Sequence, residues 1–186
     1  MLYLVQTDTT AGFLSKNFAE INRAKNRDLR MPCILTMAYF SELLRFVRVP
    51  KVHKNLVRKA RKTSFVYVNL NLNRTLKKLN AEFSNDLSEN LANFDENLVD
   101  LKGFDLINFK GTLACRVVKD CTHSEFLRQN GAFFSSSANL HGENFNPQKA
   151  RQITLLNGGK IIDETLFCGK ASTLIRLFRA KRCKIR

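Results

Sequence analysis

Tryptophan is absent from the 186-residue chain, and proline, histidine and glycine are scarce. The three histidines stand far apart, and none of the five cysteines forms a Cys-x-x-Cys pair. A zinc site is therefore not predicted, because such sites usually bring their ligands in closely spaced pairs, and no residue is assigned as a metal ligand. The odd cysteine count also argues against a disulfide framework, so we expect buried free thiols in a reducing compartment.

Signals for a membrane, for secretion and for the common nucleotide-binding loops are also lacking. No apolar run is long enough to cross a bilayer, and the apolar start at residues 1–5 is too short for a signal peptide. We therefore expect a cytoplasmic protein that makes no membrane contact. Neither Gly-x-Gly-x-x-Gly nor Gly-x-x-x-x-Gly-Lys-[Ser/Thr] occurs, and no serine lies in a Gly-x-Ser-x-Gly elbow. A bound nucleotide must then be held by other groups.

Acidic residues are few: 16 Asp and Glu stand against 31 Lys and Arg, which gives a net charge of +15. Seven of the acids and one base lie between Glu82 and Asp105, so the remainder of the chain carries +21. Such an excess attracts a polyanion such as RNA or an anionic substrate such as ATP. A solvated surface rich in lysine is the alternative explanation.

Apolar runs typical of strands alternate with helical spacing, which predicts an α/β fold with an open, mixed sheet and flanking helices in one domain, 1–186. Residues 71–110 are rich in Asn, Leu and acids and are interpreted as a divergent insertion. Ser15 is the expected cap of a helix over 13–27. The expected strands are 2–5, 31–36, 64–70, 112–118, 160–163 and 172–178, and the other expected helices are 38–47, 51–62, 124–129 and 147–154.

The stretch 133–142 combines two phenylalanines with three serines, Asn139 and Gly142. The phenylalanines are expected to end a buried strand, and the serines to form a polar turn. Backbone N–H groups, hydroxyls and an amide in such a turn can surround an oxyanion. A strand-to-helix turn with a Ser or Asn cap explains the same residues without a ligand.

Three sets of cations are candidates for binding anions. Lys25 and Arg27 close the first helix and can hold a carboxylate or phosphate, or simply form a solvated helix end. Arg116 stands alone in an apolar strand, so it needs either a structural ion pair or an anionic ligand. The stretch 51–62 carries six bases and is the strongest local candidate for RNA contact, through Lys54, Arg58, Arg61 and Lys62, although a solvated helix face is about as common.

Five separated stretches, in order along nearly the whole chain, resemble the motifs of the YrdC-like family, the threonylcarbamoyl-AMP synthases. Ala11 stands where the family has a tyrosine. The five stretches are Thr7-Asp8-Thr9-x-x-Gly12, Lys25-x-Arg27, Thr112-Leu113-Ala114-x-Arg116-Val117, Ser135-Ser136-Ser137-Ala138-Asn139-Leu140-x-Gly142 and Gly169-x-x-Ser172-Thr173-Leu174-Ile175.

The resemblance implies a twisted open α/β sheet with a large basic cavity. It also implies a reaction in which ATP, L-threonine and bicarbonate give threonylcarbamoyl-AMP and pyrophosphate with Mg²⁺, in the pathway to threonylcarbamoyladenosine in tRNA. The implied partners are tRNA or double-stranded RNA and the other proteins of tRNA threonylcarbamoylation. A divergent, noncatalytic paralogue that binds RNA or a nucleotide is the alternative function.

The resemblance also assigns site residues. The family's K-x-R and S-x-N motifs imply a central catalytic group of Lys25, Arg27, Ser137 and Asn139, with the two cations facing phosphate or carboxylate charge. The residues implied to bind substrate or nucleotide are Thr7, Thr9, Thr112, Arg116, Ser135 and Ser172.

Overall fold

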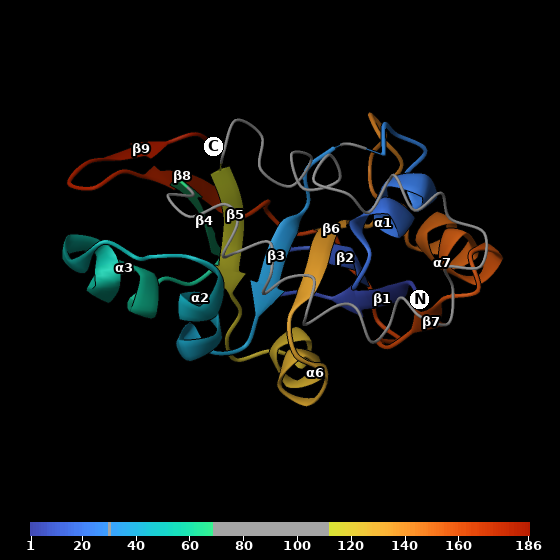
Figure 1. The fold of residues 1–186 in the computed structure, drawn as a ribbon. Helices are drawn as coiled ribbons and strands as arrows, with labels where there is room; N and C mark the ends of the chain where they lie inside the picture. Colours follow the sequence, from blue (N-terminus) through green and yellow to red (C-terminus); the bar gives the residue numbers. More distant parts are fainter. Residues whose placement is uncertain (30, 69–111) are drawn as a thin grey trace, which may run out of the picture.

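The computed structural model describes residues 1–29, 31–68 and 112–186. They form one nine-stranded sheet with both parallel and antiparallel neighbours, in the order β7-β1-β2-β6-β3-β5-β4-β8-β9 (Figure 1). The sheet is flanked by α-helices, so the predicted α/β class with an open, mixed sheet is confirmed. The insertion predicted at 71–110 lies outside the described residues, and the large basic cavity stays a prediction.

The order of the elements follows the sequence expectation closely. The helices are α1 (Phe18–Ala24), α2 (Phe40–Phe46), the 3₁₀ turn η1 (Lys51–His53), α3 (Lys54–Lys59), α6 (Thr122–Asn130) and α7 (Pro147–Leu156). The strands are β1 (Tyr3–Gln6), β2 (Ala11–Ser15), β3 (Ile34–Met37), β4 (Thr63–Val68), β5 (Thr112–Val117), β6 (Phe133–Ser137), β7 (Lys160–Ile161), β8 (Thr173–Leu177) and β9 (Arg182–Lys184).

The helix predicted over 13–27 is wrong at its start. Residues 11–15 form β2, which pairs antiparallel with β1 on one side and β6 on the other, and all five residues are buried. The helix begins at Phe18, and its cap is Asn17, whose Oδ1 accepts from the N–H of Ala19 at 2.9 Å. Ser15 instead donates to Glu20 Oε2 at 2.6 Å. The stretch predicted as one helix over 51–62 is η1 followed by α3, which ends at Lys59.

The two faces of the sheet differ in character. Because side chains alternate along a strand, Phe13, Leu35 and Phe134 share one face, where the large apolar core also receives side chains from α1, α2, α3 and α7. A smaller apolar cluster lies on the other face and includes Leu127 of α6. Full burial of such a side chain stabilises the fold by about 1.5–3 kcal/mol. The larger cluster therefore supplies most of the packing that holds the strands in register.

Polar side chains are concentrated on the face with the smaller cluster. Ser135 lies opposite Leu14 and Ile34, and Thr36 lies beside Arg116, so these positions share a face. Ser137 and Thr112 belong to it by the same alternation. Four predicted site residues, Thr112, Arg116, Ser135 and Ser137, thus come to one surface of the sheet from two strands.

The five cysteines are all free, but only Cys33 and Cys115 are buried, whereas Cys168 and Cys183 are exposed. The expectation of buried thiols is therefore wrong for the last two. Within the described residues, no group of three or more His, Cys, Asp or Glu could hold a metal ion. None of the helices there has the length and apolar content needed to cross a bilayer.

Candidate functional site

The loop after β1 is shaped by its own threonines. Thr7 Oγ1 donates to the carbonyl of Thr10 at 2.7 Å and accepts from the N–H of Thr9 at 3.2 Å. It also lies 3.1 Å from Thr9 Oγ1. Side-chain bonds of this kind fix a turn locally. Thr7 therefore holds the loop in shape, while the buried hydroxyl of Thr9 is directed toward β5.

Arg116 meets this loop from β5. Its Nη2 forms an ion pair with Asp8 Oδ1, and its Nη1 lies 3.4 Å from Thr9 Oγ1. The residue is 6% exposed, and burial lowers the pKa of its guanidinium to about 10, so it stays charged at neutral pH. Of the two roles left open for Arg116, the structural ion pair is observed. The carboxylate of Asp8, between two threonines after a strand, was expected to meet a ligand or a metal ion or to form a local turn; it pairs with Arg116 instead.

Lys25 is buried at the C-terminal end of α1 and reaches across to the end of β6. Its Nζ donates to the carbonyl oxygen of Ser137 at 2.5 Å, to the carbonyl oxygen of Asn139, and to Asn139 Oδ1 at 3.2 Å. Burial, and then the charge of Arg27, lower the pKa of its ammonium to about 8. The alternative of a solvated helix end is wrong for Lys25, which is 2% exposed.

Arg27 is held beside Lys25 by residues that sequence reasoning missed. Its Nε donates to Asn22 Oδ1 at 2.7 Å, and its Nη2 lies 3.4 Å from Cys33 Sγ. Asn22 is itself fixed, since its Nδ2 donates to the carbonyls of Leu29 at 2.7 Å and Met31 at 2.9 Å. The turn at Asn26 has a φ of 49°, so the chain doubles back rather than extending. The sequence signal for this contact was an Asn, Asn22, on the apolar side of α1.

The serine stretch is a strand for longer than predicted. Residues 135–137 belong to β6, and the turn begins at Ala138, whose N–H donates to the carbonyl of Ala11 at 2.9 Å. The amide of Asn139 donates to the carbonyls of Leu140 at 2.9 Å and Glu143 at 2.7 Å, so it fixes this turn. Ser137 is exposed at the end of the strand. The donor-rich turn is therefore shorter than the sequence suggested.

The segment after β7 closes the other side of the first loop. The N–H of Phe167 donates to Gln6 Oε1 at 2.8 Å, and its carbonyl accepts from the N–H of Ala11 at 3.2 Å. The segment ends at Ser172, whose buried hydroxyl lies 3.2 Å from Ser64 Oγ. Ala11 itself points into the large apolar core. The position at which the family has a tyrosine thus contributes to packing in this chain.

The predicted site residues form two groups, which the pairing of β2 with β6 brings together. Lys25 meets Ser137 and Asn139, whereas Thr7, Thr9 and Arg116 meet around Asp8, and the Ala138–Ala11 hydrogen bond joins the groups. Thr112 and Ser135 share the sheet face, and Ser172 lies at the entry to β8. The four residues predicted to contact RNA, Lys54, Arg58, Arg61 and Lys62, lie on α3 and the turn before β4 instead.

We expect the substitution Gly169→Ala to destabilise the fold and to displace the first loop. A Cβ atom at Gly169 would overlap the carbonyl oxygen of Thr9, which is backbone and cannot rotate away. Overpacking of this kind typically costs about 1–3 kcal/mol, and for a chain of this size each kcal/mol lowers Tm by roughly 2–4 °C. Thermal unfolding measures the shift. Lys170→Ala, at an exposed neighbour, is the control, and equal Tm values for the two variants would contradict the close approach.

No family model matches the sequence, and no curated protein matches it. Solved structures do match. A P. abyssi Sua5 variant with two alanine substitutions matches with a TM-score of 0.71 at 17% identity over 100% of this chain. P. abyssi Sua5 complexed with L-threonine matches with 0.66 at 17% identity, again over 100% of this chain. The chain spans about half of the Sua5 chain, 49% in both cases.

E. coli YciO matches with a TM-score of 0.68 at 16% identity, over 100% of this chain and 82% of YciO. Structural matches at identities this low establish the fold and not the activity. All three alignments extend over the whole length of this chain. The chain therefore has the YrdC-like fold, in which it is similar to Sua5 and YciO.

Proposed function

We propose that the chain is an L-threonylcarbamoyladenylate synthase that uses ATP, L-threonine and bicarbonate. The observation that carries the proposal is the position of Lys25. Its Nζ donates to the carbonyl oxygens of Ser137 and Asn139, which lie more than a hundred residues later in the sequence. This contact joins the Lys25-x-Arg27 stretch to the Ser137-x-Asn139 stretch. The L-threonine bound in the Sua5 structure of the same fold supports threonine as the amino acid substrate.

In the proposed reaction the amine of threonine combines with bicarbonate to form a carbamate and release water. A carbamate oxygen attacks the α-phosphate of ATP, and the bond to the β-phosphate breaks so that pyrophosphate leaves. The phosphate oxygens carry the negative charge during this attack. Catalysis therefore needs positioning and charge stabilisation rather than a protein nucleophile.

Lys25 and Arg27 supply the positive charge. Lys25 remains mostly protonated at neutral pH, and Arg27 lies close enough to lower the pKa of Lys25. Ser137 accepts from Lys25 through its carbonyl oxygen, and the residue is exposed at the end of β6.

Lys25, Arg27 and Ser137 form one wall of the proposed substrate site. The loop with Thr7 and Thr9, together with Arg116 and Ser172, is proposed to form the second wall. Magnesium would come with the triphosphate, since Mg²⁺ is commonly held by substrate phosphates and one or two carboxylates. The carboxylate of this wall, Asp8, is committed to Arg116. The described residues are therefore assigned to the nucleotide and the amino acid, and none to the metal ion.

Pyrophosphate release by the purified chain tests the proposal. We expect release from ATP and Mg²⁺ only when L-threonine and bicarbonate are both present, with threonylcarbamoyl-AMP detected by mass spectrometry. The control variant is Lys160→Ala, an exposed cation of β7, which should keep the full rate. Release that continues without threonine or bicarbonate would contradict the synthase. ATP binding without any release would favour the noncatalytic nucleotide-binding paralogue.

A further inference from the structure

The three N–H groups of the Lys25 ammonium are all matched by oxygens of the protein. The carbonyl oxygens of Ser137 and Asn139 accept two of them, and Asn139 Oδ1 lies within reach of the third at 3.2 Å. A bound anion would therefore feel the charge of Lys25, but a hydrogen bond to the anion would cost Lys25 one of these oxygens. The neighbouring cation, Arg27, is the better source of N–H groups.

The guanidinium of Arg27, which is half-buried, is held along one edge of its planar fork of five N–H groups. Its Nε donates to Asn22 Oδ1 at 2.7 Å, and its Nη2 donates to Cys33 Sγ at 3.4 Å. These two contacts lie on the side of the fork that carries Nε. Within the described residues, the opposite edge with Nη1 is left for a ligand. Paired N–H groups of this kind bind phosphate or carboxylate oxygens in a bidentate manner.

The two groups that hold this edge are neutral. Asn22 offers an amide oxygen, and burial raises the pKa of the Cys33 thiol, so the sulfur stays protonated at neutral pH. Arg116 is held differently, because its partner is the carboxylate of Asp8, which offsets its charge. Arg27 is thus oriented without losing the charge that an anionic ligand needs.

Asn22 is itself held in one orientation. The residue is fully buried on α1, and its Nδ2 donates to the carbonyls of Leu29 and Met31, so the carboxamide is fixed at both ends. Its backbone carbonyl also accepts from the N–H of Arg27 at 3.1 Å, since the chain turns back at Asn26, where φ is 49°. Asn22 therefore fixes the backbone and the side chain of Arg27 together.

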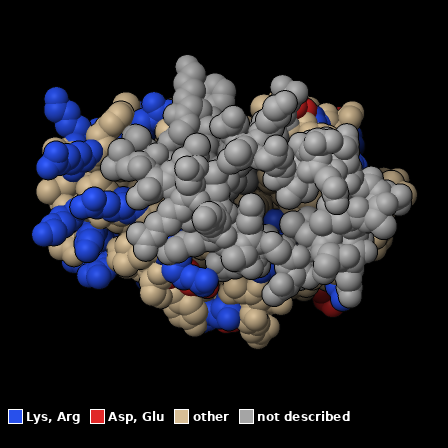
Figure 2. All heavy atoms as spheres, viewed as in Figure 1, with Lys and Arg blue, Asp and Glu red and all other residues tan. Residues whose placement is uncertain are grey.

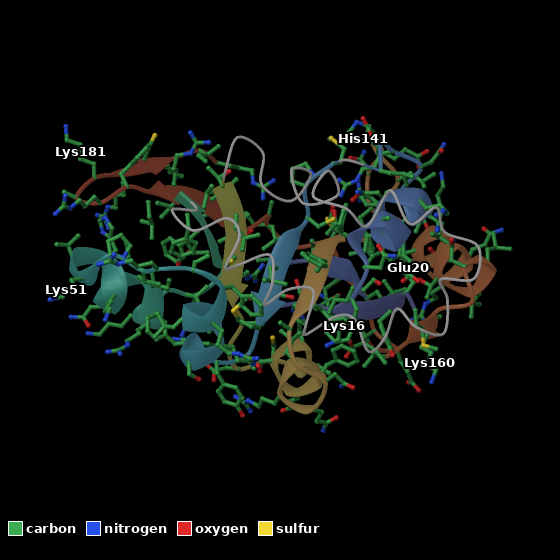
Figure 3. All side chains as sticks on the ribbon, viewed as in Figure 1. Lys16, Glu20, Lys51, His141, Lys160 and Lys181 are labelled. Carbon is green, nitrogen blue, oxygen red and sulfur yellow. The ribbon has the colours of Figure 1, made fainter. Side chains whose placement is uncertain are left out.

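The cations near α1 must supply the charge of this site themselves. α1 packs on β2 and β6, whereas Figure 2 shows Lys and Arg gathered on the left, where Figure 1 has α3 and the β8–β9 hairpin. In Figure 3, His141 lies at the α1 end, and Lys51 and Lys181 lie at the other. Five strand spacings, about 24 Å, separate β2 from β8. The Debye length is about 10 Å at 0.1 M salt, so the distant charges are largely screened.

We propose that Asn22 is a positioning residue that holds the open edge of the Arg27 guanidinium toward an anionic group of the substrate. The inference rests on the proposed function for that substrate, ATP or L-threonine, whose phosphate and carboxylate oxygens share this chemistry. An arginine that moved freely among rotamers would lose that freedom on binding, which weakens a complex. A pre-oriented Arg27 avoids this cost. Asn22 lies on the buried side of α1 and acts through Arg27 without touching the substrate.

The proposal is tested by the affinities for ATP and for L-threonine, measured separately by calorimetry in a double-mutant cycle of Asn22→Leu and Arg27→Met. Asn22→Leu should weaken binding of the ligand that Arg27 holds by roughly tenfold, as expected for the loss of a hydrogen bond to a charged group. In the Arg27→Met background it should change the affinity by less than about twofold, because no guanidinium is left to orient. Arg23→Met, at an exposed position of the same helix, is the matched control background, in which the tenfold loss should remain.

An NMR signal reports the contact itself. In protein with isotope-labelled arginine, the Nε–H of Arg27 should exchange slowly with solvent, and its signal is identified by its loss in Arg27→Met. Asn22→Leu should abolish the slow exchange. If circular dichroism shows that Asn22→Leu does not fold, Asn22→Ser takes its place, since the smaller side chain leaves room for a water at the two carbonyls that Asn22 serves.

Equal losses of affinity in the parent and Arg27→Met backgrounds would overturn the proposal, because Asn22 would then act only on the turn after α1. Slow exchange of the Arg27 Nε–H without Asn22 would overturn it as well. Coupling with either ligand supports the proposal and identifies the anionic group that Arg27 holds. The predicted coupling in a chain that releases no pyrophosphate would contradict the synthase and leave this inference standing. A parent chain that binds neither ligand would overturn both.

Discussion

Replacing Lys25 with alanine is expected to abolish pyrophosphate release and to destabilise the fold by about 1–3 kcal/mol, the usual cost of leaving buried polar groups unpaired. The substitution removes the ammonium group from the proposed phosphate site. It also leaves the carbonyls of Ser137 and Asn139 without their donor at the junction of α1 and β6. A helix-end lysine in solvent would contribute little to stability, but this one is 2% exposed.

Activity and stability must be measured together for this variant. Circular dichroism and urea unfolding give the stability, and pyrophosphate release is measured at a temperature at which the variant is fully folded. Arg23→Ala is the matched control, since Arg23 is an exposed cation in the last turn of the same helix. Full activity in folded Lys25→Ala would contradict the proposed role of Lys25.

The low pKa of Lys25, about 8, gives this role a signature in the pH profile. The ammonium group loses its proton as the pH rises through 8, so kcat/KM should fall on the alkaline side with a single ionisation. Lys25→Arg, if active, should lack this fall, because a guanidinium stays charged. The effect on stability has the opposite sign. Between pH 8 and 10.5 the unfolded chain holds the proton and the folded chain does not, so this group makes the fold more stable as the pH rises.

Local patterns predicted most of the elements but not the depth at which their side chains lie. The apolar spacing of α2 and α7 and the run at 112–118 were enough to place those elements within a few residues. β2 was missed because Ala11–Ser15 is buried on all sides between β1 and β6, and such a run lacks the alternation that marks a half-exposed strand. Its last three residues were therefore absorbed into the helix predicted over 13–27.

In the candidate site, too, the residue types could be predicted from the sequence, whereas their burial and contacts could not. The cations and serines could be named from motifs, but the sequence does not show that Lys25 is buried against backbone carbonyls. Nor does it show that Asn22 holds Arg27, or that Asp8 neutralises Arg116. The contacts of Lys25 and Asp8 depend on how far α1 and the first loop lie from β6 and β5, and the Asn22–Arg27 contact depends on the turn after α1. Tertiary distances of this kind are not encoded in a single motif.

Replacing Arg116 with alanine is the second substitution for which we expect a large effect. It would leave the carboxylate of Asp8, whose side chain is 13% exposed, without its partner. Breaking a buried pair from one side costs about 3–5 kcal/mol, a large part of the roughly 5–15 kcal/mol that stabilises a typical domain. Chemical denaturation would measure this loss. Because an unfolded variant is also inactive, the alanine variant alone does not separate the structural from the functional role of Arg116.

The double variant Asp8→Asn/Arg116→Met makes that separation. Both charges are removed and the volumes are nearly kept, so most of the lost stability should return, since a well-packed neutral replacement of a buried ion pair is often close to neutral. If Arg116 also binds the nucleotide, the restored fold should bind ATP more weakly by calorimetry and release pyrophosphate slowly. Asp8→Asn alone keeps the guanidinium and should bind ATP at least as well as the parent chain. Parental ATP affinity in the double variant would show instead that Arg116 acts only by holding the first loop to β5.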